Sequence, residues 1–331
     1  MTRKDAPIIG GIDLGATKIL SVVVTQSGKL LAEDTRPTQG AAGPDAVIAN
    51  MIASLRQAVA NGEGAQLAAI GIDAPGPVEY DRGIITSPPN LPGWHDVPLA
   101  SIIEKEFGVP CVLENDANAA ALAEHRWGAG RGSRHMLFLT VSSGVGGGII
   151  IDGDLYRGAS GAAGEVGHMS INARGARCHC GGRGCLEMYA SGVGIGRLAQ
   201  RLVRQHPDSP LARLAREQPL SAKLVHQAAD QGDEDARRLI IAAGQALGIG
   251  LGSLIDLLNP QIIVLDGSLT KMGDLYLGPA RETAQKESFE QNWSDVRIVV
   301  GELGDRCAAL GAAAVAMEPM HADEEPSARL G

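Results

Sequence analysis

Two segments with the same pattern, one near the start of the chain and one near its middle, restrict the possible folds most. Each contains a strand, a glycine-containing turn and a second strand, and they span Ile8 to Val24 and Met136 to Ile151. A third apolar run follows the turn at Gln26 to Lys29, so the first segment is expected to open an antiparallel meander. Two such hairpins that face each other would form the two jaws of a cleft.

The rest of the chain alternates between strand patterns and helical periodicity, which is typical of an α/β fold. Strands are predicted at 67–74, 109–114, 262–265 and 296–300, and helices at 44–59, 99–107, 117–127, 188–259, 279–288 and 307–317. This order favours an actin-like (ribonuclease H-like) fold of two α/β domains. We expect a small domain of residues 1–115 and 305–318, a large domain of 116–304, and a disordered tail over 319–331.

Composition narrows the class of protein. The 331 residues are 44% hydrophobic, only 3% aromatic, and include 44 glycines, which describes an α/β enzyme with a core of small aliphatic side chains. The formal charge of −9 argues against a nucleic-acid partner. The apolar run after Lys4 is interrupted by Gly10, Gly11 and Asp13, so no signal peptide is expected, and no window approaches a membrane span. A cytoplasmic location follows, where clustered thiols stay reduced and favour metal binding over disulfides.

A metal site is predicted in the loop that contains Cys178, Cys180 and Cys185, with His168 shortly before it. These four side chains can converge on one tetrahedral Zn²⁺ ion. Because four protein ligands leave no open position for water, the ion should be structural. The alternative is unrelated thiols in a flexible loop, although cysteine is usually buried singly. His179 is a competing nitrogen ligand, but a residue between two ligating cysteines usually points away.

The turn of the first hairpin is a candidate phosphate-binding loop with the sequence Asp13-Leu14-Gly15-Ala16-Thr17-Lys18. Backbone N–H groups around Gly15 and Thr17 would cradle a phosphate, and Asp13 would hold Mg²⁺ directly or through water. The alternative is an ordinary turn that needs its glycine for conformational reasons, with Lys18 in solvent.

The turn of the second hairpin supports the phosphate interpretation. Its sequence is Ser143-Gly144-Val145-Gly146-Gly147-Gly148, and the missing side chains let phosphate oxygens approach the backbone. Neither turn is a Walker A motif or a dinucleotide-binding fingerprint.

Asn115 and Asp116 stand where a strand passes into an alanine-rich helix. They could be helix caps and nothing more. Beside two phosphate loops, however, Asp116 could accept a hydroxyl proton during phosphoryl transfer, and its ordinary pKa of about 3.9 would suffice. Glu165, His168 and Glu187 flank the cysteines. They could be surface charges and a core histidine, but their clustering favours recognition of a polyol.

Taken together and in order, these motifs resemble the ROK family of sugar kinases and regulators, most of all its bacterial glucokinases, from Gly11 to about Met317. The resemblance rests on Asp13-Leu-Gly-Ala-Thr-Lys18, Ser87-Pro-Pro-Asn-Leu-Pro-Gly-Trp94, Glu114-Asn-Asp-Ala-Asn118, Gly144-Val-Gly-Gly-Gly148, Glu165-Val-Gly-His168 and Cys178-His-Cys-Gly-Gly-Arg-Gly-Cys185-Leu-Glu187. It implies an actin-like fold, ATP with Mg²⁺ as the donor, and transfer to the 6-hydroxyl of a hexose.

The resemblance also implies roles for single residues. Asp116 would be the general base. The hexose would be bound by Asn90, Asn115, Glu165, His168 and Glu187, and zinc by His168, Cys178, Cys180 and Cys185. The nucleotide would contact Asp13, Gly15, Ala16, Thr17, Lys18, Ser143, Gly144, Gly146 and Gly267.

Two departures from the family pattern stand in the expected nucleotide site. Ser142-Ser143 replaces the usual Gly-Thr before the second turn, which keeps a hydroxyl but adds a Cβ atom. Asp266-Gly267-Ser268 replaces the usual run of glycines after a late strand, which puts an acid near the expected nucleotide. Both departures therefore concern the binding of the donor and not the sugar chemistry.

The resulting expectation is a cytoplasmic, ATP-dependent hexose kinase of carbohydrate metabolism and glycolysis, acting on glucose, and a homo-oligomer (dimer or tetramer). One alternative is a kinase for N-acetylmannosamine, N-acetylglucosamine or another hexose. A second is a sugar-sensing regulator, which the acidic charge and a fold that begins within the first dozen residues argue against. A third is a catalytically dead sugar-binding module, which the presence of Asp116 and both phosphate loops argues against.

Overall fold

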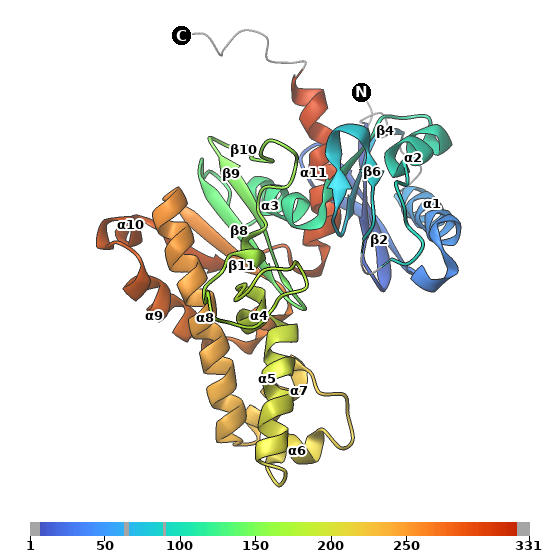
Figure 1. The fold of residues 1–331 in the computed structure, drawn as a ribbon. Helices are drawn as coiled ribbons and strands as arrows, with labels where there is room; N and C mark the ends of the chain where they lie inside the picture. The colour runs from blue at the N-terminus through green and yellow to red at the C-terminus, as the bar shows by residue number, and fades with distance from the viewer. Residues whose placement is uncertain (1–6, 63–65, 89–90, 323–331) are drawn as a thin grey trace.

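The computed structural model describes residues 7–62, 66–88 and 91–322, with side chains described as far as Glu318. Its framework is two five-stranded sheets (Figure 1). The first has the order β3-β2-β1-β4-β7, made of β1 Ile8–Leu14, β2 Lys18–Thr25, β3 Leu30–Pro37, β4 Leu67–Ala74 and β7 Cys111–Asn115. The second has the order β10-β9-β8-β11-β12, made of β8 Met136–Val141, β9 Val145–Ile151, β10 Asp154–Leu155, β11 Ile262–Asp266 and β12 Arg297–Val300.

The two sheets repeat one another strand for strand. In each, a central antiparallel hairpin gains a further antiparallel strand on one side and two parallel strands on the other. The hairpins are β1 with β2 and β8 with β9, the two segments that the sequence pattern indicates. Their central strands are buried and consist mainly of apolar residues and glycine, as expected for strands covered on both faces. The predicted internal repeat is therefore confirmed.

Two helices lie between the sheets, α3 (Asp116–Trp127) and α11 (Cys307–Ala322). They pack on each other, with α11 against β1 and β4 and α3 against β8 and β9. The contacts are very close: a Cβ atom on Gly71 would lie 1.8 Å from the carbonyl oxygen of Ala312, and one on Gly311 would lie 2.0 Å from that of Ala119. Glycine and alanine therefore let the backbones approach to a distance that larger side chains would prevent.

The remaining elements surround the two sheets or connect their strands. Those of the first sheet are η1 Gly40–Ala42, α1 Pro44–Asn61, β5 Val78–Glu79, η2 Tyr80–Arg82, β6 Ile84–Ile85 and α2 Leu99–Phe107. Those around the second are η3 Val166–His168, α4 Glu187–Ala190, α5 Gly192–Gln205, α6 Pro210–Leu214, α7 Ala222–Asp230, α8 Glu234–Leu258, η4 Ser268–Met272, α9 Asp274–Glu287, α10 Glu290–Asp295 and η5 Gly304–Arg306. Helices α5 to α7 and one end of α8 form a lobe that projects from the second sheet (Figure 1).

Helix α8 corrects the expectation that no segment approaches a membrane span. Among the described residues, this helix alone is long and apolar enough to cross a bilayer. However, 67% of its apolar window is buried inside the protein. Gly244 and Gly248 lie against the backbone of α9, with Cβ positions 2.3 Å from the Tyr276 oxygen and 2.5 Å from the Ala280 oxygen. The apolar composition is that of a core helix.

Other differences from the sequence-based expectations are local. The helical stretch 188–259 is divided into α4 to α8, and the helix expected at 279–288 begins earlier, at Asp274, so that Pro279 lies inside it. The tail expected from residue 319 is wrong for its first four residues, because α11 continues to Ala322. Glu318, just before that stretch, is held by an ion pair with Arg157. Residues 323–331 lie outside the described residues.

We propose that the two sheets correspond to two domains, with 1–115 and 305–318 in the smaller and 116–304 in the larger. The packing of α11 on β1 and β4 supports the assignment of 305–318 to the first sheet.

The close approach of α11 to the first sheet gives a stability prediction. Gly71→Ala should lower the free energy of unfolding by about 1–3 kcal/mol, because the new methyl group overlaps the Ala312 carbonyl. The matched control is Gly196→Ala in α5, where the nearest atom to an added Cβ is the Leu220 oxygen at 3.9 Å, an ordinary contact, and a gain of about 0.4–1 kcal/mol is expected. Urea unfolding of both variants measures the difference. Equal effects would contradict the packing described.

Candidate active site

The turn between β7 and α3 positions Asn115 and Asp116. Asn115 is the N-cap of α3, and its Oδ1 accepts hydrogen bonds from the N–H groups of Ala117 (3.0 Å) and Asn118 (3.3 Å). The buried Glu114 accepts from the Asn115 N–H at 2.9 Å and from Asn118 Nδ2 at 3.0 Å. The expected capping role of this pair is therefore present, and it fixes the direction of the Asp116 side chain.

Asp116 titrates near neutrality. Burial raises its pKa to about 6, and the carboxylates of Asp13 and Glu165 add to the effect, although the N–H of Ala117 donates to its Oδ1 at 2.8 Å. The ordinary value assumed from the sequence is therefore too low, because burial depends on the packing of α3. A carboxylate with this pKa can accept a proton at pH 7 more readily than an ordinary aspartate.

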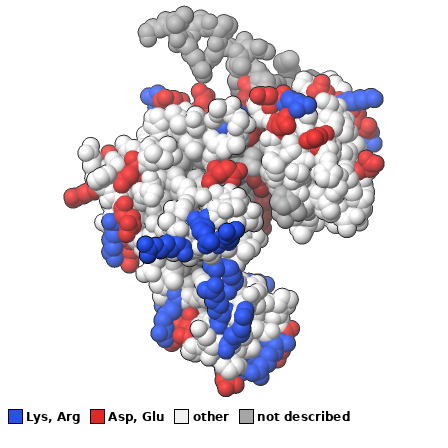
Figure 2. Space-filling view, viewed as in Figure 1, with Lys and Arg blue, Asp and Glu red and all other residues white. Residues whose placement is uncertain are grey.

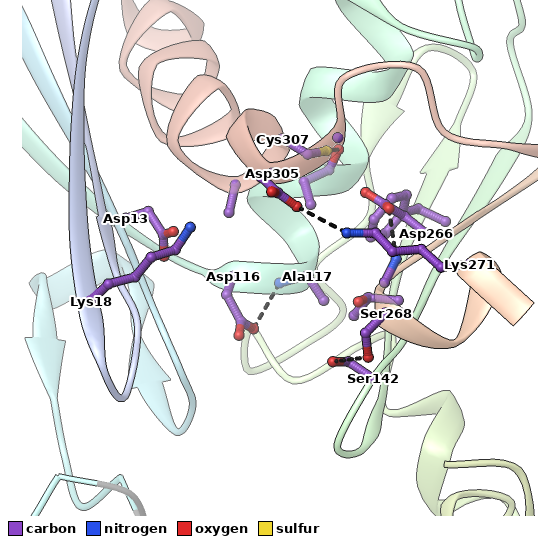
Figure 3. Close-up of a pocket in the computed structure, with 16 residues that line it drawn as sticks. Asp13, Lys18, Asp116, Ala117, Ser142, Asp266, Ser268, Lys271, Asp305 and Cys307 are labelled. Atoms are coloured by element: carbon purple, nitrogen blue, oxygen red, sulfur yellow. Dashed lines mark hydrogen bonds and ion pairs between the residues drawn. The ribbon is translucent and has the colours of Figure 1, made fainter. Parts of the chain in front are cut away.

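A cavity of about 390 Å³ separates the turns of the two hairpins (Figure 3). Asp13 and Lys18 of the first hairpin line one side, and Ser142 lies at the end of β8. On the opposite side are Asp266, Ser268 and Lys271, and the start of α3 and Asp305 lie between the two sides; Gly267 also lines the cavity. Lys271 Nζ lies 3.6 Å from Asp305 Oδ1, and the hydroxyls of Ser142 and Ser268 are 3.0 Å apart.

Not all the residues predicted to bind nucleotide line this cavity. Asp13, Lys18 and Gly267 do so. Gly15, Ala16 and Thr17 form the adjoining tight turn, closed by the Gly15 N–H to the Lys18 oxygen at 3.0 Å. Ser143 lines a neighbouring cavity of about 610 Å³, which shares Ser142 and Ser268 with the first and runs along the start of α5. Gly146 lines the cavity described in the next paragraph. Gly144 lines none of these three cavities.

A second cavity, of about 370 Å³, is lined by three of the predicted hexose ligands, Asn115, Glu165 and His168, and by the predicted base Asp116. Its other walls include the loop 161–164 and His179. Glu187 is not among its lining residues, and Asn90 lies outside the described residues. Asp116 and Ala117 line both this cavity and the first. One carboxylate therefore borders two separate cavities.

The cysteine loop brings together the predicted zinc ligands. One nitrogen of His168 and the sulfurs of Cys178, Cys180 and Cys185 all lie within 4.8 Å of one another. Cys178 Sγ is 3.6 Å from His168 Nδ1, and Cys180 Sγ is 3.6 Å from Cys185 Sγ. Around an ion with Zn–S bonds of about 2.3 Å, tetrahedral ligands would be about 3.8 Å apart. The donor set and the spacing both fit Zn²⁺.

Glu187 and His179 lie against this cluster. Glu187 Oε1 is 3.2 Å from Cys178 Sγ and from His179 Nδ1, and 3.7 Å from His168 Nδ1. His168, His179 and Glu187 form a second group that could hold an ion, which keeps His179 as a competing ligand. Since His168 belongs to both groups, one site excludes the other. The first group contains three free cysteines, of which Cys178 and Cys185 are buried, and thiolates are common ligands of Zn²⁺, so the first group is favoured.

Sequence reasoning missed Asp73 at the end of β4. Asp73 is in register with Asp13 of β1 and Glu114 of β7, so three acids share one sheet edge. It is fully buried beside the carboxyl of Asp13, to which its own carboxyl can hydrogen-bond when one of the two is protonated. Burial, together with Asp13 and Asp116, raises the pKa of Asp73 well above its ordinary value, which favours the neutral acid. An acid at the end of a buried strand was the available signal.

Lys271 and Asp305 were also missed, and no local pattern could have found them. Each is an exposed residue of a short 3₁₀ element, and only the fold brings them to one cavity. His179 was noticed as a metal ligand, but its position in the wall of the second cavity was not expected.

Comparisons with known proteins identify relatives over almost the whole chain. The model of the ROK family matches residues 9–318. A glucokinase of Thermotoga maritima is 34% identical over 309 residues, which are 93% of this chain and 96% of that protein. A xylose repressor of Caldicellulosiruptor bescii is 32% identical over 322 residues, which are 96% of this chain and 80% of the repressor.

Among solved structures, a ROK family glucokinase from Streptomyces griseus in complex with glucose and AMPPNP has a TM-score of 0.79 to this protein. The two are 33% identical, and the match covers 94% of this chain and 99% of that one. These likenesses confirm the resemblance found in the sequence and the actin-like fold class.

The departure at Asp266 leads to a prediction on donor binding. The side chain lines the first cavity, burial raises its pKa, and its Oδ1 accepts the Gly267 N–H at 2.6 Å. If the carboxylate repels nucleotide phosphates, Asp266→Gly should tighten ATP binding by about threefold to tenfold.

Asp266→Asn is the matched control, because it removes the charge and keeps an acceptor for Gly267. It should tighten ATP equally, with a melting temperature closer to that of the wild type. Calorimetric ATP titration and thermal melting measure both effects. Unchanged ATP affinity in both variants, with a lower melting temperature for glycine alone, would mean that Asp266 only caps the turn.

Proposed function

The chain belongs to the ROK family, and from this membership we propose that it transfers the γ-phosphoryl group of ATP to the 6-hydroxyl of a hexose, with glucose as the substrate. The observation that carries the proposal is the position of Asp116, which borders both the cavity between the hairpin turns and the cavity beside Glu165 and His168. A base that removes a proton from the acceptor and faces the donor has to occupy such a position.

In the proposed reaction, the hexose occupies the second cavity, where Asn115, Glu165 and His168 offer hydrogen-bonding groups to its hydroxyls. Glu187 and Asn90 remain proposed sugar ligands. Asp116 accepts the proton of the 6-hydroxyl while the oxygen attacks the γ-phosphorus and the bond to the β-phosphate oxygen breaks. Burial of Asp116 brings its pKa close to the pH at which the proton is transferred.

The donor would lie in the first cavity and extend into the neighbouring one along α5. Lys18 and Lys271 face it from opposite sides, and the turn Gly15, Ala16 and Thr17 and the residues Ser143, Gly144, Gly146 and Gly267 remain proposed contacts. Asp13 lines this cavity, and its carboxylate is a suitable ligand for a hard divalent cation. Mg²⁺, when bound, neutralises charge on the transferred phosphoryl group.

We further propose that His168, Cys178, Cys180 and Cys185 hold one structural Zn²⁺. The spacing of the four donor atoms supports this, as does the contact of Glu187 with Cys178 and His168. His168 also lines the hexose cavity, so the ion would fix a side chain that binds sugar.

The proposed location is the cytoplasm, and the proposed state is a homo-oligomer (dimer or tetramer) without membrane or nucleic-acid partners. Exposed apolar side chains such as Leu257 and Phe289 offer surface for self-association. The acidic net charge supports the absence of nucleic acid, although Lys and Arg gather in a band over the front of the molecule down to the α5 to α7 lobe (Figure 2).

A panel of hexoses and N-acetylhexosamines with ATP, in a coupled assay of ADP release, tests the function. Glucose should give the highest kcat/KM. A clear preference for N-acetylmannosamine or N-acetylglucosamine would correct the substrate and leave the reaction standing. No turnover with any sugar would overturn the kinase proposal, and binding of xylose or another sugar without turnover would favour the sensor that the repressor likeness allows.

The base assignment predicts a pH profile. Because the pKa of free Asp116 is raised to about 6, kcat/KM should fall about tenfold per pH unit below pH 6, where the carboxyl becomes protonated. Asp116→Asn should lower kcat by about 10²–10⁴-fold at pH 7.5 while hexose binding stays measurable by calorimetry. The control is Asp274→Asn on the exposed end of α9, which should behave as wild type. Near-normal turnover of Asp116→Asn would reduce this residue to a cap.

The zinc assignment predicts about one zinc per chain in protein purified without chelator. Cys180→Ser should lower the zinc content, the melting temperature and the hexose affinity together, since the loop holds Glu187 and His168. Cys111→Ala, a buried cysteine of the first sheet, is the control that should keep the zinc. Mass spectrometry of metals decides the point, and zinc-free protein with full hexose affinity would refute the site.

A further inference from the structure

We infer that Arg157 is a positioning residue for the proposed transfer, on which this inference rests: it ties the loop that carries Glu165 to the turn that carries Asp116. Arg157 follows β10, an edge strand of the second sheet. All the groups that its guanidinium contacts belong to the first sheet, its connections or the end of α11.

Three contacts fix the guanidinium. Arg157 Nε donates to Glu114 Oε2 at 2.7 Å, and Arg157 Nη2 donates to Glu318 Oε2 at 2.5 Å. The group also lies over the ring of Tyr80, 4.1 Å from its centre. The side chain of Arg157 is only 20% exposed, so these interactions are weakly screened by solvent. One side chain therefore joins β7, η2 and α11 to the loop after β10.

The contact with Glu114 affects the base directly. Glu114 is 1% exposed, and its other oxygen holds the Asn115 N–H and the Asn118 side chain, which define the turn before Asp116. Without Arg157, the carboxylate would be buried without an opposite charge, a state that costs much more than an exposed unpaired charge. The turn would then rearrange so that the Glu114 carboxylate contacts water, and Asp116 would move with the turn.

Arg157 also affects the opposite wall of the hexose cavity, which is formed by the loop that begins at this residue. Arg157 opens a loop with three glycines at positive φ, Gly158, Gly161 and Gly164, so the loop has little stiffness of its own. The Arg157 carbonyl accepts the N–H of Ala163 at 3.0 Å, which closes the loop. Residues 161–165 line the cavity, Glu165 among them. Arg157 thus anchors the loop wall against the β7–α3 turn.

A purely stabilising ion pair is the competing explanation. It would lower the melting temperature on removal and would weaken both ligands or neither. The positioning role separates the ligands, because the hexose cavity has both walls attached to Arg157, whereas none of the residues that line the first cavity contacts it.

The experiment compares Arg157→Met, Glu114→Gln/Arg157→Met and Arg157→Lys with wild type, after folding is checked by circular dichroism. Arg157→Met should lower kcat by about 10–100-fold, since small misplacement of a base has effects of this order, and raise the KM for hexose. ATP affinity by calorimetry should stay within about twofold of wild type, because the loop does not line the first cavity and the turn reaches it only through Asp116 and Ala117. In the double variant, the buried carboxylate is replaced by a neutral amide, so no unpaired charge is left and kcat should recover. The hexose KM should stay high, because the loop is still not anchored by Arg157.

Arg157→Lys should fall between wild type and Arg157→Met, because a single ammonium cannot reproduce the guanidinium's contacts with both carboxylates. The matched control is Arg134→Met, which removes an exposed ion pair with Asp152 near the β8–β9 hairpin and should change nothing.

Several outcomes overturn the inference. Wild-type kcat and KM in Arg157→Met would do so, and so would equal losses of hexose and ATP affinity, or a double variant no better in kcat than the single one. If Arg157→Met does not fold, Arg157→Lys decides by the same hexose and ATP measurements. The wild-type enzyme is assayed first: no turnover with any hexose refutes the proposed function, whereas normal wild-type turnover with unaffected variants refutes the role of Arg157 alone.

Discussion

The packing of α3 against α11 is the contact on which the rest of the structure depends. These two helices are the only described elements that lie between the sheets, and each covers a different sheet. Their backbones, and those of β1 and β4, come so close that Gly11, Gly71 and Gly311 have no room for a side chain. This spacing sets the distance between the two hairpin turns, and therefore the width of the cavity that opens between them. The 44 glycines and the alanine-rich helices of the sequence are the means by which a chain with few aromatic residues obtains a dense interior.

A concentration of acids is the second feature of the site. Asp13, Asp73, Glu114 and Asp116 lie at the ends of neighbouring elements, and burial raises the pKa of the first, second and fourth. Only Glu114 has a full set of partners, which Arg157 completes. Carboxyl groups therefore outnumber positive charges at this edge of the sheet, and protonation of some of them lowers its negative charge. A cationic ligand is what such an edge attracts.

The sequence predicted those features that depend on short segments. The hairpins, the cap at Asn115 and the cluster of cysteines each arise from neighbouring residues, and the structure has all three. What it could not predict depends on register or on packing between distant segments. Asp73 meets Asp13 only through the pairing of β4 with β1, and the raised pKa of Asp116 comes from burial by the assembled fold. Arg157 had no visible signal, because Glu114 and Glu318 are 43 and 161 residues away. The roles assigned to single site residues remain predictions.

The position of α11 has a consequence for how the protein is made. The first sheet is built from residues 8–115, but the helix that covers it is the last in the described chain, at 307–322. During synthesis from the N-terminus, this sheet emerges with the face of β1 and β4 uncovered. The second sheet, with all its strands between 136 and 300, can close before the last helix leaves the ribosome. The sheet that is translated first is thus covered last, and in the interval its apolar face stays exposed to solvent.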